Sequence, residues 1–458
     1  MFEKVLIANR GEIAIRIIRA LREMGIKSVA VYSTADKDAQ HVKEADEAVC
    51  IGAPQPADSY LKMENIVSAA ILTGATAIHP GYGFLSESPE FAQLCEKCQL
   101  TFIGPKSETI ALMGNKANAR EAMRQHQVPV IPGSQGFVKD SDAALAVAKE
   151  VGFPVMLKAV AGGGGKGIRQ VNKPEDLPNA FAQAQEEARL SFGDGRMYVE
   201  KIISPAKHIE VQIIGDQNGH VVALPERDCS MQRNHQKVIE ETPCSQINDD
   251  ERVYLQEIAI KAVKAIKYEN VGTIEFLMDP DHHFYFMEMN TRIQVEHSIT
   301  EEVAHVDLVK EQIKIAAGMD LTMTQDQVKV HGAAIEARIN AENPAKNFQP
   351  QAGTIKQMSL PGGLGIRIES GVNSGDTVSP FYDSMIIKII AHATDRPLAI
   401  RRLIDALNEF QVTGLTTNRS FLVKLLQDKV FNDGNYLITY LDQTFLPQYI
   451  KEAQKEDK

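Results

Sequence analysis

The chain has 458 residues, of which 44% are hydrophobic and 24% are charged, a composition typical of ordinary globular domains. At ~150 residues per domain, this length predicts about three domains. The formal net charge is -11 and no basic stripe interrupts it, which argues against nucleic acid or an anionic membrane as the main partner. The apolar run from Val5 to Ala8 is too short for the core of a signal peptide, and no window approaches the ~20 apolar residues of a membrane span. We therefore expect a cytoplasmic protein.

The N-terminal residues predict a parallel sheet. Residues 3–9 form a short strand, and a helix follows with Ile13, Ile17 and Leu21 on one face. Residues 28–32 form a second strand. This order of strand, helix and strand predicts a doubly wound sheet.

A dinucleotide site is the competing interpretation of this start. The first turn, residues 9–12, lacks the three-glycine fingerprint, which disfavours that interpretation. Arg16 and Arg19 fall on the polar face of the helix, where they are either solvated or part of a subunit contact.

The pattern changes near residues 113–116. From there to about residue 300 the strands are longer and form hairpins. A last segment begins with the alternating strand 334–340 and ends in helices around Leu403 and Leu422.

The five cysteines are sparse and odd in number, which indicates reduced thiols. Cys95 and Cys98 form a lone Cys-x-x-Cys inside a helical stretch. Because no second pair completes a zinc site, we expect buried helix residues at these two positions.

A run of glycines lies between two predicted strands. Residues 153–160 form the first strand, 161–167 contain the run with Lys166, and 168–171 form the second strand. The run does not precede a helix as a Rossmann loop does, and it lacks the Ser or Thr of a Walker loop. It is typical of a flap that covers ATP phosphates, with Lys158 as a point charge for a phosphate. The alternative is a flexible surface loop.

A second hairpin carries candidate metal ligands. A turn centred between Asp281 and His282 places Glu275 opposite Glu288, and Asn290 points the same way. Two carboxylates facing each other across a hairpin repel unless a cation lies between them. Glu, Glu and Asn are hard ligands suited to Mg²⁺ or Mn²⁺ shared with phosphates. A solvated face with paired Lys or Arg is the alternative.

The same alternation continues beyond the hairpin and recurs upstream. Arg292 and Glu296 extend the polar face past Asn290. Upstream, Arg233, His235 and Lys237 share parity and can converge on an anion. An exposed edge strand protected by charge explains that upstream segment equally well.

With these motifs in order, the chain from residue 2 to about 446 resembles the biotin carboxylase family, within the ATP-grasp superfamily. The landmarks that carry the resemblance lie at residues 7–14, 79–87, 226–230 and 288–297. The resemblance implies an α/β protein with a doubly wound N-terminal domain, a central ATP-grasp domain with a glycine-rich lid, and a C-terminal α+β domain. The implied domains are 1–114, 115–322 with its lid at about 131–203, and 330–446, followed by a tail at 447–458.

The resemblance also implies a role for each candidate site residue. The ATP-binding residues would be Lys116, Lys158, Gly164, Gly165, Glu200, Lys201, Ile202, Ile203, His208 and His235. Those at the metals would be Glu275, Glu288 and Asn290. Lys237, Arg292 and Val295 would position bicarbonate, Glu296 would deprotonate it, and Arg338 would face the ureido oxygen of biotin.

These residue types suit ATP-dependent carboxylation of biotin through carboxyphosphate. The chain departs from the family pattern at Asn115, Lys207, Asn234 and Ala333, none of which is a proposed chemical residue. No Met-Lys-Met segment is present, so biotin would be carried by another protein. We expect a free-standing subunit that works with a biotin carboxyl carrier protein and carboxyltransferase subunits, and a homodimer.

The acceptor expected first is acetyl-CoA, as in fatty acid biosynthesis, with pyruvate or another acyl-CoA as the alternative. Another ATP-grasp ligase would share the ATP and metal residues, but it would give no reason for Arg338 or the run from Arg292 to Glu296. A non-enzymatic ATP-binding subunit would be expected to have damaged catalytic positions, and here they are intact.

Overall fold

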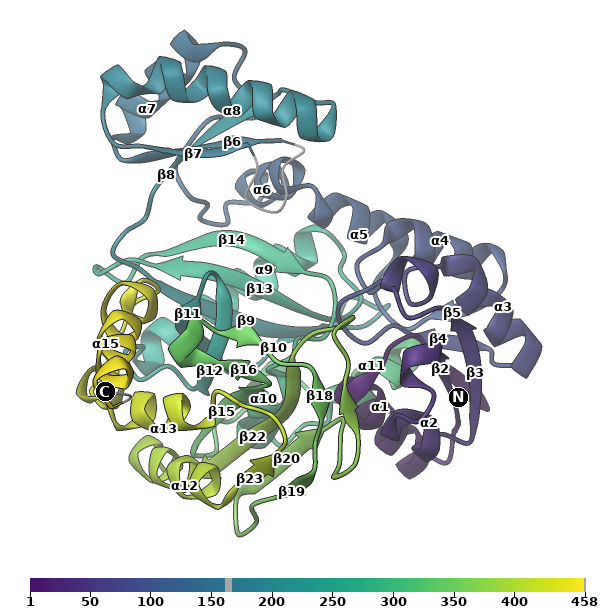
Figure 1. Cartoon of the computed structure of the whole chain (residues 1–458). Helices are drawn as coiled ribbons and strands as arrows, with labels where there is room; N and C mark the ends of the chain where they lie inside the picture. Colours follow the sequence, from purple (N-terminus) through teal and green to yellow (C-terminus); the bar gives the residue numbers. More distant parts are fainter. Residues whose placement is uncertain (161–166, 457–458) are drawn as a thin grey trace. The chain divides into compact units, whose positions relative to one another are not determined.

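The computed structural model describes residues 1–160 and 167–456 and divides the chain into two compact units. The first unit contains Met1–Ile110, Lys207–Thr273 and the chain from Asn290 onward, and the second contains Ala111–Ala206 and Ile274–Met289. Figure 1 shows the elements of both units in the colours of the sequence.

The first unit begins with a five-stranded parallel sheet in the order β3-β2-β1-β4-β5. The strands are β1 (Lys4–Ile7), β2 (Lys27–Ser33), β3 (Glu47–Gly52), β4 (Ala77–His79) and β5 (Thr101–Phe102), and the helices are α1 (Gly11–Glu23), α2 (Gln40–Glu44), α3 (Met63–Thr73), α4 (Pro89–Lys97) and α5 (Ser107–Gly114). Ile13, Ile17 and Leu21 of α1 are buried, as their spacing predicts. The predicted doubly wound start is confirmed.

Two details of this region refine the predictions. Cys95 is buried in α4, as expected, whereas Cys98 is only half-buried and caps the end of that helix; both are free thiols. Arg16 is not a solvated residue, because it is buried and its guanidinium bonds Glu301 at 2.9 Å and Asp307 at 2.6 Å. The side chain of Arg19 is half exposed.

A larger sheet forms the rest of the first unit. Its strands follow the order β13-β9-β11-β12-β15-β22-β20, and β10 pairs with β9. The bounds are β9 (Lys207–Gly215), β10 (Val221–Ala223), β11 (Arg227–Arg233), β12 (Gln236–Thr242), β13 (Asn270–Met278), β15 (Ala333–Asn340), β20 (Ile366–Ser370) and β22 (Met385–Ala393). The pairs from β9 to β20 are antiparallel. A turn at Asn218-Gly219 connects β9 and β10, with Gly219 at a φ of 83°.

Helices and short strands complete the first unit. The helices are α9 (Asp249–Ala265), α10 (His297–Ala304), α11 (Leu308–Ala316), α12 (Arg396–Glu409), α13 (Arg419–Gln427), α14 (Lys429–Asn432) and α15 (Leu446–Glu456). The short strands form the pairs β16 (Glu342–Asn343) with β17 (Gln349–Pro350), β18 (Gly353–Thr354) with β21 (Thr377–Val378), and β19 (Gln357–Ser359) with β23 (Gln411–Thr413). The segment expected as a tail after residue 446 is therefore largely helical, and Tyr449 and Ile450 pack on the core.

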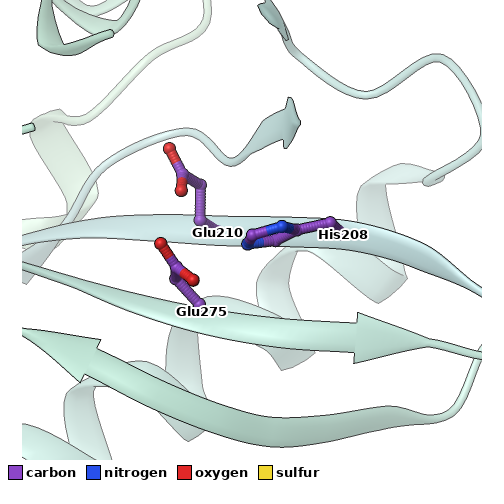
Figure 2. A group of neighbouring side chains, drawn as sticks. All are labelled: His208, Glu210 and Glu275. Atoms are coloured by element: carbon purple, nitrogen blue, oxygen red, sulfur yellow. The ribbon is translucent and has the colours of Figure 1, made fainter. Parts of the chain in front are cut away.

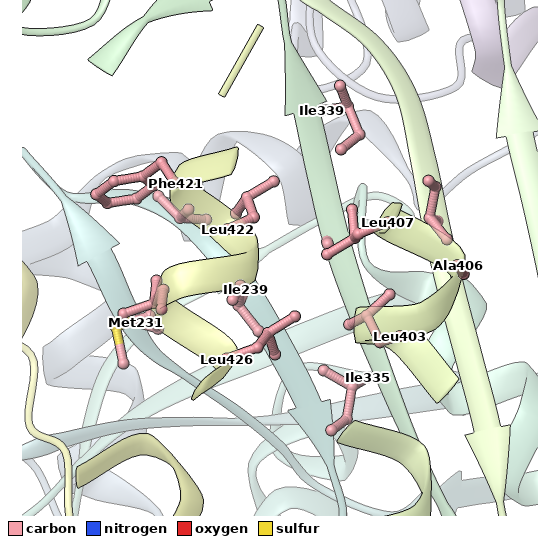
Figure 3. Packing of buried hydrophobic residues seen from close by; sticks show 14 of the residues in the cluster. Met231, Ile239, Ile335, Ile339, Leu403, Ala406, Leu407, Phe421, Leu422 and Leu426 are labelled. Atoms are coloured by element: carbon pink, nitrogen blue, oxygen red, sulfur yellow. The ribbon is translucent and has the colours of Figure 1, made fainter. Parts of the chain in front are cut away.

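Alternation along β15 separates an apolar face from a charged one. Ile335 and Ile339 belong to a core that α12 and α13 cover (Figure 3). Glu336 and Arg338 alternate with these apolar residues, so they point to the opposite face of the sheet. The candidate active site lies on that charged face.

The second unit contains the antiparallel sheet β7-β6-β8. Its strands are β6 (Val155–Ala159), β7 (Ile168–Val171) and β8 (Met197–Lys201), and its helices are α6 (Lys116–Gln125), α7 (Ser141–Val151) and α8 (Leu177–Phe192). Apolar faces of α7 and α8 pack on this sheet. The two strands predicted to flank the glycine run are confirmed. β13 continues from the first unit into this one and is followed by β14 (Phe284–Asn290).

Among the helices of the described ranges, none has both the length and the apolar character that crossing a membrane requires.

Candidate active site

A buried carboxylate lies at the centre of the charged face. Glu296 precedes α10 and is fully buried. Its oxygens accept hydrogen bonds from Lys237 Nζ at 2.6 Å and from Arg338 Nη2 at 2.8 Å. Burial alone would raise the pKa of Glu296, but Lys237, Arg338 and Arg227 hold it well below its usual range. Glu296 is therefore an ionised carboxylate that pairs with two cations, Lys237 and Arg338.

A second buried carboxylate holds Lys237 from the other side. Glu210 of β9 accepts a hydrogen bond from Lys237 at 2.5 Å and contacts the guanidinium of Arg227. Arg227 is fully buried and donates to Gln212 and Thr300, both at 2.9 Å. These bonds hold the ammonium of Lys237 between two anions, Glu210 and Glu296.

Arg338 is surrounded by acids. Its guanidinium contacts Glu240 of β12 as well as Glu296. Burial would lower the pKa of Arg338, but Glu240, Glu296 and Glu336 raise it. The side chain therefore stays cationic although it is largely buried.

Glu87 and Lys388, neither of which was a predicted site residue, hold Arg292 and Val295. Arg292 donates to Glu87 at 2.8 Å and to Asn290 Oδ1 at 3.1 Å. The carbonyl of Val295 accepts from Lys388 Nζ at 2.5 Å, and Lys388 is fully buried in β22. Glu87 lies in a landmark motif, but the sequence offers no signal that pairs it with Arg292, 205 positions away.

One prediction about the upstream strand is wrong. The chain turns at Asn234 and His235, which have φ values of 48° and 64°, and this turn separates β11 from β12. Equal parity therefore does not bring Arg233 to the site. Its guanidinium bonds Asn347 instead, whereas Lys237 lies at Glu296. His235 is exposed.

His208 lies further along the buried strand β9. Its Nδ1 lies 2.5 Å from the side-chain nitrogen of Gln232, and its backbone N–H donates to Ser230 Oγ at 2.9 Å. Figure 2 shows that His208 and Glu210 come from one strand and Glu275 from another. Glu210 was not among the predicted site residues, and its alternation with His208 along the chain is the sequence signal that could have indicated it.

The predicted nucleotide residues in the second unit bond one another and the neighbouring backbone. Lys158 of β6 contacts Glu200 of β8. Lys201 donates through its side chain to Gly152 O at 2.9 Å, and the backbone N–H of Ile202 bonds Pro154 O at 3.0 Å. Ile203, which follows β8, is half-buried. The predicted phosphate contacts of Gly164 and Gly165 lie outside the described residues.

The three candidate metal ligands lie on the predicted strands, Glu275 on β13 and Glu288 and Asn290 on β14. Lys116 Nζ lies 2.8 Å from Glu288. Burial would lower the pKa of Lys116, but Glu288, Glu200 and Glu275 raise it. Glu288 holds the ammonium group of Lys116, so it already pairs with a cation. Glu275 and Asn290 add two further hard oxygen donors on the same strands, and this donor set fits a magnesium or manganese ion.

Family models match almost the whole chain. They describe the N-terminal domain of biotin carboxylase at residues 1–110, the ATP-binding domain of the carbamoyl-phosphate synthase L chain at 115–324, and the C-terminal domain of biotin carboxylase at 336–443.

Two curated relatives agree with these models. Biotin carboxylase 1 of Bacillus subtilis is 51% identical over 443 residues, which covers 96% of this chain and 98% of that one. The small subunit of 2-oxoglutarate carboxylase from Hydrogenobacter thermophilus is 47% identical over 458 residues, covering 100% of this chain and 97% of that one.

Solved structures show the same fold. Biotin carboxylase from Campylobacter jejuni, in a β-γ-ATP complex, has a TM-score of 0.92 and 46% identity, covering 97% of this chain and 99% of that one. The biotin carboxylase domain dimer of the Hydrogenobacter thermophilus enzyme, in complex with MgADP, ADP and bicarbonate, has a TM-score of 0.91 and 48% identity, covering 97% of this chain and 98% of that one.

The fold and site define an ATP-dependent ligase with an ATP-grasp domain. The chain belongs to the biotin carboxylase family, and the predicted three-domain architecture is confirmed.

Proposed function

We propose that this protein uses ATP and bicarbonate to carboxylate biotin held on a separate carrier protein. The observation that carries the proposal is the pair of hydrogen bonds from Lys237 and Arg338 to the buried Glu296. An ionised base between two cations is suited to bind a small anion and accept its proton.

Glu296 acts on bicarbonate. Its pKa is low because Lys237 and Arg338 are directed at it. When bicarbonate enters, Lys237 is shared with the new anion, and the pKa of Glu296 rises towards the value that a base needs. Bicarbonate loses its proton to Glu296, while Lys237 and Arg292 hold the anion. Its oxygen attacks the γ-phosphate, ADP leaves, and carboxyphosphate forms and breaks down to CO₂ and phosphate.

Arg338 acts on biotin. The ureido nitrogen becomes nucleophilic when it loses its proton, which phosphate accepts in this scheme, and negative charge develops on the ureido oxygen. Arg338 is cationic and points from the charged face of β15, so it is suited to stabilise that oxygen through charge-assisted hydrogen bonds.

ATP would be held by Lys116, Lys158, His208, His235, the loop with Gly164 and Gly165, and the segment from Glu200 to Ile203. Glu275, Glu288 and Asn290 would hold Mg²⁺ or Mn²⁺, which neutralises charge on the phosphates. Before nucleotide binds, Lys116 pairs with Glu288 and Lys158 pairs with Glu200.

The final acceptor is proposed as acetyl-CoA, with malonyl-CoA as the product that feeds fatty acid synthesis. A 2-oxo acid is the second candidate, because relatives of 47% identity are named as subunits of 2-oxoglutarate and pyruvate carboxylases. The protein would act in the cytoplasm as a homodimer with a biotin carboxyl carrier protein and carboxyltransferase subunits. Adding each acceptor with its matching carboxyltransferase and carrier would separate the candidates.

The first prediction tests the half-reaction itself. Purified protein with ATP and Mg²⁺ should release ADP only when bicarbonate is present, and faster when free biotin is added. The measurement is coupled ADP release in buffer stripped of CO₂, with bicarbonate and biotin added in turn. Equal turnover without bicarbonate would rule the proposal out.

A further inference from the structure

A second pair of buried acids lies behind Arg338. β12 and β15 pair antiparallel, and the register places Glu240 directly opposite Glu336. Both side chains are fully buried. Two carboxylates facing each other across a sheet repel, and burial increases that cost because water no longer screens the charges.

The three acids around Arg338 are not equally compensated. Glu296 bonds both Lys237 and Arg338. Glu336 accepts from Ser298 Oγ at 2.8 Å and lies 3.9 Å from Lys388 Nζ. Among residues 1–160 and 167–456, Arg338 is the one cation in ion-pair contact with Glu240, and it is shared with Glu296.

The charged groups that face Glu240 are Arg338 and Glu336 from β15, Glu296 from the start of α10, and Lys237 from its own strand. Burial raises the pKa of Glu240 to about 8. The negative charges of Glu336 and Glu296 also raise this pKa, whereas the positive charges of Arg338 and Lys237 lower it. The pKa of Glu336 is also raised, by burial. The pKa of Glu296 is lowered instead. A proton bound in this cluster is therefore held by Glu240 or Glu336, and not by Glu296.

We propose that Glu240 and Glu336 share one proton in the resting enzyme, and that neutral Glu240 is a positioning residue for Arg338 in the biotin step. A neutral acid contacts the guanidinium without neutralising it. Of Glu240 and Glu296, the two acids in ion-pair contact with Arg338, only Glu296 is then anionic, and the guanidinium becomes available to the ureido oxygen once bicarbonate has given Glu296 its proton. This inference rests on the proposed function.

Ionisation of Glu240 would reverse this arrangement. A second carboxylate would bind Arg338 more strongly and would oppose the negative charge that develops on the ureido oxygen. The biotin-dependent rate should therefore fall as pH rises through about 8, the pKa of Glu240. Bicarbonate-dependent ATP hydrolysis without biotin does not use Arg338 in this way and should fall less.

The main experiment compares the two rates at pH 7 and pH 9. In the wild type, the biotin-dependent rate should drop roughly tenfold over this range, because the fraction of protonated Glu240 drops by about that factor. E240Q keeps a neutral side chain at both pH values, so its drop should be much smaller. E336Q removes the repulsion that keeps Glu240 protonated, so its loss should begin at lower pH than in the wild type.

The matched control is E226Q. Glu226 is also a fully buried acid whose pKa is raised by burial, but it bonds Arg252 and not Arg338. It should show the wild-type drop. An alkaline drop in E240Q equal to that of the wild type would overturn the proposal.

Infrared spectroscopy of the free protein gives a readout that does not depend on activity. The C=O stretch of a protonated buried carboxyl should be present in the wild type at pH 7, decline by pH 9, and be reduced in E240Q. Its absence from the wild type at pH 7 would overturn the proposal even if E240Q does not fold. Loss of biotin dependence in the wild type would count against the proposed function alone, since the infrared band would be unaffected.

Discussion

At Glu296, burial and charge act in opposite directions, and the balance determines what the residue can do. Without substrate, Lys237 and Arg338 keep the carboxylate ionised. A permanently low pKa would make a poor base. In the proposed mechanism, incoming bicarbonate draws Lys237 away from Glu296, so the binding of bicarbonate raises the pKa of Glu296 and makes it a better base.

The two arginines should respond differently to substitution. Arg338→Gln should lose biotin carboxylation by about 10²–10³-fold, the usual cost of removing a donor to a developing oxyanion. It should retain much of the bicarbonate-dependent ATPase measured without biotin. Arg292→Ala should depress both activities, because Arg292 is proposed to hold bicarbonate from the first step.

Both rates should be measured for each variant at saturating ATP and metal. Arg396→Gln is the control, since Arg396 also pairs with a buried acid, Glu241, but lies on α12 away from the bicarbonate residues. If Arg338→Gln reduced the two activities equally, its assignment to biotin would be wrong.

The roles of single residues could be predicted from the sequence only where those residues lie in long family motifs. Lys237, Glu296 and Arg338 follow from the family resemblance, and the structure brings their side chains into contact, while their roles stay predictions. Glu210 and Glu240 were missed as their partners. Their contacts depend on which strand lies beside which and in what register, and local alternation contains neither piece of information.

At the scale of elements, periodicity predicted the strands well and failed at one turn. β15 alternates as expected, and β6 and β7 flank the glycine run. Arg233 does not join Lys237 because two left-handed residues, Asn234 and His235, end one strand and begin the next. Parity holds only along one uninterrupted strand.

The β13–β14 segment gives a prediction about metal. Glu288→Gln removes one carboxylate from the proposed set, so more Mg²⁺ should be needed for half-maximal turnover, and Mn²⁺ should bind more weakly. The loss should be at least several-fold, because a neutral amide replaces an anionic ligand. The measurements are a Mg²⁺ titration of ADP release and Mn²⁺ binding followed by electron paramagnetic resonance.

Glu121→Gln is the matched control for this segment. Glu121 lies in the same unit and pairs with Arg124 on the surface of α6. It should leave both metal measurements unchanged. Unaltered Mn²⁺ binding in Glu288→Gln would remove Glu288 from the metal site.

For the whole molecule, two buried histidines predict lability in acid. Burial lowers the pKa of His41 to about 4 and that of His79 to about 3. His79 Nδ1 accepts a hydrogen bond from the Gly81 N–H at 3.1 Å, which a doubly protonated ring could not do. Both pKa values lie below those of the unfolded chain, so the unfolded state binds more protons and stability falls as pH drops from about 6.5 towards 4.

For His41 alone the loss should reach about 3 kcal/mol near pH 4. Thermal unfolding between pH 7 and pH 5 should show a falling midpoint, and His41→Gln should reduce the slope. His126→Gln, which changes an exposed histidine on the surface, should keep the wild-type slope. An unchanged slope in His41→Gln would show that other groups cause the acid lability.

The last prediction concerns assembly, and the structure changes which residues it involves. Arg16 cannot contribute a freely exposed charge to a subunit contact, because Glu301 and Asp307 already bind it within the chain. Arg19 is half exposed on the same helix, and its partner Glu369 lies 3.3 Å away. We expect a homodimer held partly by charge through this face, so dissociation should increase in high salt. Arg19→Glu should weaken the dimer further, whereas Arg124→Glu, on the surface of the second unit, should not. Sedimentation at roughly micromolar protein in low and high salt separates these outcomes.

A wild-type monomer in low salt would contradict the predicted dimer, and an unaffected dimer in Arg19→Glu would remove Arg19 from its interface.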